Sequence, residues 1–188
     1  MEAGFESNVI WRGGGLDRLL DERHVGLVSA TLTMLRRLGW EVAVEVTYSV
    51  YGERGSIDIL AFNAALRIAL VIEVKTELTS VEQLGRKLHE KVRLVRTRLC
   101  LERFGWKPVA LGRLVILPAT DTARRNVAQN DAVLETLFPA RGRDVRSWLR
   151  KPVGDIAGLL FVASTNGRSV TARLPEPTRV RKPPATAT

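Results

Sequence analysis

Gly55-Ser56-Ile57-Asp58-Ile59-Leu60 and Val71-Ile72-Glu73-Val74-Lys75 are two apolar stretches that charged residues interrupt. The first belongs to a predicted strand, Ser56 to Phe62, although aspartate is disfavoured inside strands. The second ends a predicted strand, Arg67 to Lys75, that is apolar on both faces until its end, as expected in the middle of a sheet. Residues two apart on a strand point to the same face, so Glu73 and Lys75 should project together.

A tight turn between these strands places Asp58 beside the end of the second one. Cross-strand neighbours lie within about 5 Å of each other when the register is right. Two carboxylates and an ammonium would then converge, and hard oxygen donors of this kind suit Mg²⁺ or Mn²⁺. Such an ion activates water and neutralises charge on a phosphate, while a lysine stabilises developing negative charge. The expected chemistry is hydrolysis of a phosphodiester bond.

The surrounding pattern predicts an α/β fold with a mixed sheet. Leucine and valine recur at three- and four-residue spacing from Leu16 to Leu38, which favours a helix. Val42 to Thr47 alternates apolar and polar residues as a half-buried strand does, and Gly52 to Gly55 is a predicted turn. Thr79 or Ser80 can cap a long helix that runs to about Arg103. The three strands between the helices are joined by tight turns and should be antiparallel.

The remaining elements follow the long helix. They are a short strand from Arg113 to Leu117, a helix from Thr120 to Leu137, and two further strand candidates, Val145 to Leu149 and Leu159 to Ala163. A strand that follows a helical crossover should pair in parallel with the last strand before it. We expect residues 1–15 to be a flexible lead-in, 16–165 to form one α/β domain, and 166–188 to be a basic, proline-rich disordered tail.

Composition limits the class of protein. The single cysteine, Cys100, excludes an internal disulfide and a multi-cysteine zinc site. No apolar run approaches the length of a membrane helix, and the first residues do not read as a signal peptide, so a cytoplasmic protein without a membrane partner is expected.

The formal net charge is +9, and seven basic residues against three acidic ones lie between Val81 and Gly105. A second group, five basic residues and one acid, lies between Arg141 and Lys151. Such fields attract nucleic acid. An arginine-rich composition inherited from a genome of high GC content is the alternative explanation.

The two quoted stretches, with a helix before the three strands and another after them, resemble the PD-(D/E)XK nuclease superfamily. This superfamily includes restriction endonucleases and archaeal Holliday-junction resolvases. The resemblance covers about residues 16–118 and implies a restriction-endonuclease-like core in the order α-β-β-β-α-β. It implies that Asp58, Glu73 and Lys75 are catalytic. It also implies that Asp58, Glu73 and the Val74 carbonyl bind the metal.

Some positions depart from the family pattern. Ile57 stands where a proline often precedes the aspartate, and Lys87 stands four residues after Gln83 where one branch has tyrosine. The family often adds an acidic residue from its first helix, and Glu22 is our choice for this catalytic role, with Asp21 and Glu45 as rivals. A favourable charge near the start of a helix is the structural alternative for Glu22.

Four basic residues are predicted to contact the nucleic acid, which we expect to be DNA: Arg54, Arg86, Lys87 and Lys91. A solvated helix face is the alternative for those on the second helix. The fold also suggests a homodimer, because many such nucleases dimerise to cut both strands. A second hypothesis is a catalytically silent module for DNA binding, regulation or protein interaction. It rests on a looser similarity to a nuclease-like domain found behind helix-turn-helix domains in actinobacterial regulators, which would make a helix-turn-helix protein a partner.

Overall fold

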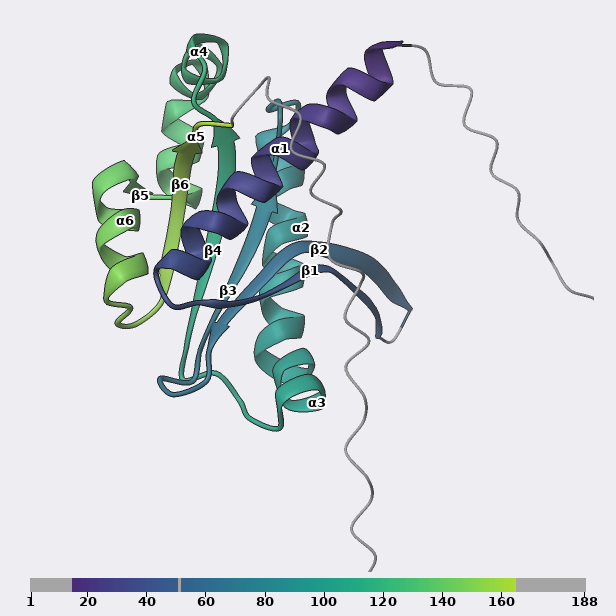
Figure 1. Ribbon diagram of the computed structural model, residues 1–188, viewed down its shortest axis with the longest axis vertical. Helices are drawn as coiled ribbons and strands as arrows, with labels where there is room; N and C mark the ends of the chain where they lie inside the picture. The colour runs from purple at the N-terminus through teal and green to yellow at the C-terminus, as the bar shows by residue number, and fades with distance from the viewer. Residues whose placement is uncertain (1–14, 51, 165–188) are drawn as a thin grey trace, which may run out of the picture.

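The computed structural model of this chain describes residues 15–50 and 52–164, with side chains from residue 22 onward. It contains a six-stranded mixed sheet in the order β1-β2-β3-β4-β6-β5, with helices on both faces (Figure 1). The strands are β1 (Glu41–Val50), β2 (Glu53–Asn63), β3 (Ile68–Val74), β4 (Ala110–Pro118), β5 (Ala140–Arg141) and β6 (Ile156–Val162). The helices are α1 (Gly15–Arg37), α2 (Val81–Leu94), the π-helix η1 (Val95–Leu99), α3 (Cys100–Phe104), α4 (Asp121–Gln129), α5 (Asp131–Leu137) and α6 (Gly142–Arg150). Within the described ranges, no helix is long and apolar enough to cross a membrane.

The predicted α/β class and the order helix, three strands, helix, strand are confirmed. β1 pairs with β2 and β2 with β3 in antiparallel fashion, whereas β3 pairs with β4 in parallel. The parallel pair needs a long connection, which α2, η1 and α3 provide. All seven residues of β3 are buried, as its apolar sequence predicts for a central strand.

Two apolar clusters cover the two faces of the sheet. On one face α1 and α6 pack against β2, β3 and β4 through residues such as Leu27, Leu35 and Trp148. On the other face α2, α3 and α5 pack through residues such as Leu88, Cys100 and Leu134. The helices therefore enclose the sheet as outer layers (Figure 1), and polar groups at the end of β3 lie where the α2 layer meets the sheet.

The hairpin β1–β2 extends beyond its pairing with β3. The β2–β3 ladder ends at the pair Ile59 and Ile72, but the β1–β2 ladder continues to Val50 and Glu53. Val44 packs in the α1 cluster and Val46 in the α2 cluster, so this strand exchanges its faces at Glu45, which has a positive φ of 49°. The free end of the hairpin consequently bends away from the sheet, as Figure 1 shows.

Several sequence predictions need correction. Val145 to Leu149 is not a strand but part of α6, because Val145, Trp148 and Leu149 are spaced i, i+3, i+4 and form its buried face. The predicted helix Thr120 to Leu137 is broken at Asn130 into α4 and α5. The predicted turn at Gly52 is shorter than expected, since β2 already begins at Glu53.

Other predicted boundaries are confirmed. Ser80 caps α2 by accepting a hydrogen bond from the Gln83 amide, and Thr120 caps α4 through the Ala123 amide. The predicted lead-in (1–15) and tail (166–188) lie outside the described residues, apart from Gly15, at which α1 begins.

Candidate active site

A cleft of about 390 Å³ opens between the free end of the β1–β2 hairpin, the end of β3 and helix α2. The catalytic candidates Asp58, Glu73 and Lys75 all line it, one from β2 and two from the end of β3. Its other walls are Tyr48, Arg54, Gly55, Ser56, Thr79, Ser80, Gln83, Leu84, Lys87, Glu90 and Lys91. The sequence prediction that the three charged residues share one place is therefore confirmed.

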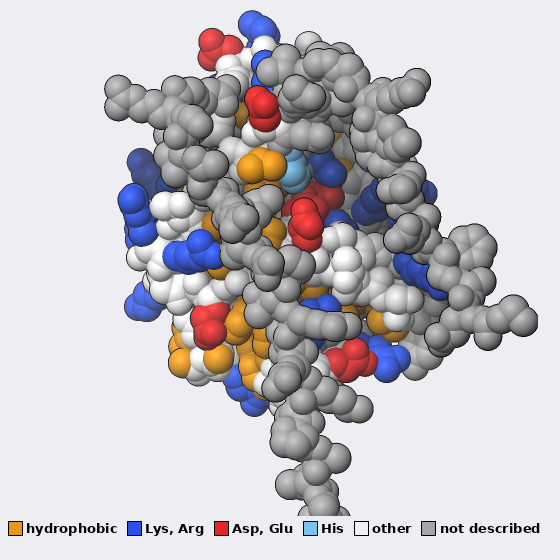
Figure 2. Space-filling model, turned by 45° about the vertical axis from the view of Figure 1, so that its right-hand side comes forward, with side chains coloured by type: hydrophobic (Ala, Val, Ile, Leu, Met, Phe, Trp, Pro, Cys, Tyr) orange, Lys and Arg blue, Asp and Glu red, His pale blue; other side chains and the backbone are white. Residues whose placement is uncertain are grey.

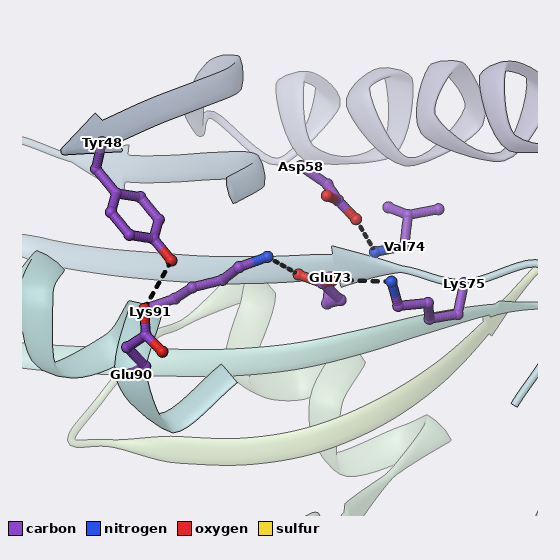
Figure 3. Close-up of polar contacts among 7 residues, drawn as sticks. All are labelled: Tyr48, Asp58, Glu73, Val74, Lys75, Glu90 and Lys91. Atoms are coloured by element: carbon purple, nitrogen blue, oxygen red, sulfur yellow. Dashed lines mark hydrogen bonds and ion pairs between the residues drawn. The ribbon is translucent and has the colours of Figure 1, made fainter. Parts of the chain in front are cut away.

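Asp58 lies where β2 separates from β3. Its Oδ2 accepts a hydrogen bond of 2.7 Å from the Val74 amide (Figure 3). Because β2 diverges from β3 at this point, the carboxylate replaces the backbone carbonyl that would otherwise accept this bond. The amide and carbonyl of one residue point to the same side in an antiparallel ladder, so the Val74 carbonyl faces this gap as well. Burial and then the neighbouring Glu73 carboxylate raise the pKa of Asp58, despite the opposing Val74 amide, Lys91 and Lys75.

Glu73 is buried, at 5% exposure, and each of its carboxylate oxygens faces a lysine (Figure 3). Lys75 Nζ lies 2.9 Å from Oε1, and Lys91 Nζ lies 2.5 Å from Oε2. The two lysines differ in environment, because the Lys75 side chain is 41% exposed and the Lys91 side chain 8%. With Asp58, these four charges sum to zero, so the site is electrically balanced as it stands.

Tyr48 closes one end of the cleft. Its ring is buried, and its hydroxyl donates a hydrogen bond of 3.1 Å to Glu90 Oε1 on α2. Burial, then this hydrogen bond and the charge of Glu90, raise the pKa of Tyr48 to about 12. The opposite residue, Gly55, leaves the space that the ring needs, since a Cβ there would lie 2.5 Å from the Tyr48 oxygen.

The four residues predicted to contact nucleic acid lie in three different settings. Arg54 and Lys87 are exposed and line the cleft, whereas Arg86 is exposed on α2 outside the lining. Lys91 departs from the expectation. It lies on the apolar face of α2, is 7% exposed, and directs its ammonium to Glu73 at the inner side of the cleft.

Glu22 is exposed on α1 and does not line the cleft, so the structure does not bring this predicted residue to Asp58. The rival Glu45 lies closer in the fold. It lies between Val44 and Val46, which pair with the two neighbours of Asp58, and both Glu45 and Asp58 line a second cavity of about 380 Å³ on the α1 side. The structure does not describe the side chain of Asp21, the other alternative to Glu22.

Three basic side chains of α2 and η1 form ion pairs with acidic side chains of the protein. Arg93 contacts Glu53, Arg96 contacts Asp155 and Arg98 contacts Glu102, at 2.6, 2.5 and 2.9 Å. On the face in Figure 2, acidic and basic side chains are interspersed among hydrophobic ones. The charge available to a polyanion at the cleft therefore comes chiefly from Arg54 and Lys87.

The cleft contains oxygen donors of the kind that a divalent ion binds. Within the part of the chain that the structure describes, no group of three or more His, Cys, Asp or Glu side chains could hold a metal. The donors at hand are the two carboxylates and the Val74 carbonyl, and all are hard oxygen ligands. Burial first, and the Glu73 carboxylate second, raise the pKa of Asp58, so a cation beside this carboxyl would favour its ionised form. The set fits one Mg²⁺ or Mn²⁺, provided that Glu73 shares its oxygens, which each have a second lone pair, with the lysines.

Sequence reasoning missed the role of Lys91, although a signal was present. Val81, Leu84, Leu88 and Lys91 are spaced at three or four residues and form one buried face of α2. A lysine on such an apolar face needs a buried acidic partner. The partner is Glu73, the one acidic residue of the apolar strand β3.

No protein-family model matches the chain, and a search of curated proteins found no match either.

Proposed function

We propose that this protein is a metal-dependent nuclease that hydrolyses phosphodiester bonds in DNA. The observation that carries the proposal is the convergence of Asp58, Glu73 and Lys75 in one cleft, from two strands separated in sequence. Taking charged groups out of water costs folding free energy even when they are paired, so a buried glutamate with two lysines at the end of an apolar strand favours a chemical role.

The arrangement of the elements supports a restriction-endonuclease-like core. α1, three antiparallel strands, α2 and the parallel strand β4 follow in the order of the PD-(D/E)XK superfamily. The acidic pair lies on the second and third strands, where that superfamily carries it. A shared fold does not by itself imply a shared activity, so the activity depends on the residues of the site.

Asp58, Glu73 and the Val74 carbonyl would hold one Mg²⁺ or Mn²⁺, whose chemistry when bound is to acidify a water molecule and neutralise phosphate charge. The half-exposed Lys75 ammonium lies beside Glu73 at the open side of the cleft. From there it can stabilise negative charge that develops on the scissile phosphate. Arg54 and Lys87, on opposite walls, would bind neighbouring phosphates and align the backbone.

A second candidate function is a catalytically silent DNA-binding or regulatory module with the same fold. The observation that favours it is the double engagement of Glu73, because a carboxylate held by two ammonium groups is a weaker metal ligand. On this alternative the four charges are a structural ion network, and DNA binding would not depend on a divalent ion.

One experiment separates the two candidates. Purified protein is incubated with supercoiled, linear duplex and single-stranded DNA and with RNA, in Mg²⁺, in Mn²⁺ and in EDTA. The nuclease proposal expects cleavage of at least one DNA form with metal only. Lys75→Ala should lower this rate by about 100-fold or more and leave DNA binding nearly unchanged.

The matched control is Lys107→Ala, a neutralisation of an exposed lysine away from the cleft and outside both basic groups, which should leave cleavage unchanged. If Lys75→Ala cleaves as fast as the wild-type protein, the site assignment is wrong.

A further inference from the structure

Lys91 is a buried cation placed on a proposed metal ligand. Its ammonium lies 2.5 Å from Glu73 Oε2, and the residues are 7% and 5% exposed. Figure 3 shows Lys91 reaching Glu73 on the side opposite to Lys75. It also lines the cleft, so the Lys91–Glu73 contact lies at the cleft and not in a separate part of the core.

The two lysines on Glu73 have different freedom to move. Lys75 follows β3 directly and keeps 41% of its side chain exposed, so it can turn toward solvent while its charge stays hydrated. Lys91 comes from the buried face of α2, between Leu88 and Leu94, and its side chain is 8% exposed. A buried ammonium that loses its carboxylate is left uncompensated, which is unfavourable. Lys91 therefore holds Glu73 more firmly than Lys75 does.

We propose that Lys91 holds Glu73 at the cleft in the metal-free protein and competes with a divalent ion for Glu73 Oε2, and that for metal affinity this competition outweighs the benefit of holding the carboxylate in place. This inference rests on the proposed metal site. Lys91 fixes the carboxylate that would otherwise be free to rotate, and it also weakens the site for the ion. Binding of the ion then requires the Lys91 ammonium to be shared or displaced within the cleft.

The competition has a consequence that a purely structural ion pair does not have. Removing a structural pair loosens the site and should weaken metal binding. Removing a competing cation deletes like-charge repulsion of the ion and frees an oxygen ligand, so metal binding should become tighter. The sign of the change in affinity distinguishes the two roles.

The test is the binding of Mn²⁺ alone, measured by the electron paramagnetic resonance signal of the free ion, in wild-type protein, Lys91→Met and Lys87→Met. Methionine preserves most of the length and the apolar stem of lysine without the charge. Lys87 is the matched control, since it is on the same helix, one turn away, and lines the same cleft but is exposed. Lys91→Met should bind Mn²⁺ tighter by about tenfold or more, and Lys87→Met within about twofold of wild type.

Unchanged or weaker Mn²⁺ binding in folded Lys91→Met overturns the inference, as does an absence of Mn²⁺ binding in every protein. If Lys91→Met does not fold, as judged by circular dichroism, two further measurements decide. Lys91→Gln keeps a donor for Glu73 and should also bind Mn²⁺ tighter than wild type. In wild-type protein with ¹³C-labelled lysine, Mg²⁺ should shift the Lys91 side-chain resonance and leave that of Lys151 in place; an unshifted Lys91 signal at saturating Mg²⁺ contradicts the competition.

These measurements distinguish a failure of the Lys91 inference from a failure of the nuclease proposal. Tighter Mn²⁺ binding by Lys91→Met with no cleavage of any nucleic acid would support the inference and refute the nuclease proposal. Metal-dependent cleavage by wild type with no gain in affinity for Lys91→Met would do the reverse.

Discussion

Gly55→Ala should destabilise the protein by forcing Tyr48 out of its place at the end of the cleft. A Cβ on Gly55 would lie 2.5 Å from the Tyr48 hydroxyl oxygen, 2.7 Å from Cζ and 3.2 Å from Cε1, so the ring must move. Overpacking of this kind costs about 1–3 kcal/mol. The shift also strains the hydrogen bond from Tyr48 to Glu90, which contributes about 1 kcal/mol. We expect a loss of about 2–3 kcal/mol.

The measurement is urea unfolding followed by tryptophan fluorescence. With a slope near 2 kcal/mol per molar urea, the midpoint should fall by about 1 M or slightly more. In a Tyr48→Ala background the clash is gone, and Gly55→Ala should then cost less than about 0.5 kcal/mol. Gly26→Ala is the matched control. Gly26 lies inside α1, and a Cβ on it would lie 3.8 Å from its nearest heavy atom, Ser164 Cβ. Gly26→Ala should therefore stabilise the protein by about 0.5–1 kcal/mol. An unchanged midpoint for Gly55→Ala would refute the described packing of Tyr48.

Three further predictions test the charges and the core. Burial and Glu73 raise the pKa of Asp58 in the folded protein. Ionisation of this group therefore lowers the free energy of unfolding at pH values above that pKa. This loss is absent once the pH is below the ordinary aspartate pKa. Asp58→Asn should therefore melt higher than wild type at pH 7 in calorimetry and lose this advantage near pH 3; a lower Tm at pH 7 would contradict it. Burial raises the pKa of the Cys100 thiol to about 12, so it should resist a disulfide reagent at pH 8 until urea unfolds the protein, and fast reaction in the native state would be inconsistent with its place. Replacing Arg86 and Lys87 by glutamine should reduce the log–log salt slope of duplex DNA binding by up to about 1.8, at about 0.9 per lost phosphate contact. An unchanged slope would show that these two residues are a solvated face.

The sequence predicted the central part of the fold because the pattern there is dominated by single, strong signals. The apolar run that ends at Glu73 and Lys75 is rich in β-branched residues and follows a turn, which favours a central strand, and Thr79 and Ser80 marked the start of α2 within one residue. Val145 to Leu149 failed because a short apolar segment does not show by itself whether it is helical. The break at Asn130 has no strong sequence signal, since no glycine or proline marks it.

The sequence predicted the three central residues of the candidate site but not the ion pairs that they form. Asp58, Glu73 and Lys75 could be joined by strand periodicity and one hairpin. The position of Glu22 away from the cleft depends on how α1 crosses the sheet, which no local pattern encodes. The sequence groups Lys91 with Arg86 and Lys87 as basic residues of one helix, although the spacing on α2 places it on the buried face.

The most direct test of the nuclease proposal is the rate of metal-dependent cleavage of one labelled DNA by wild-type protein and by Asp58→Ala, with binding of the same DNA measured in parallel. Asp58→Ala should fold, bind DNA at least as tightly without metal because a negative charge is lost from the cleft, and cleave at least about 100-fold more slowly. Wild-type protein that binds Mn²⁺ and leaves the DNA intact would contradict the proposal, and so would Asp58→Ala that cleaves at the wild-type rate.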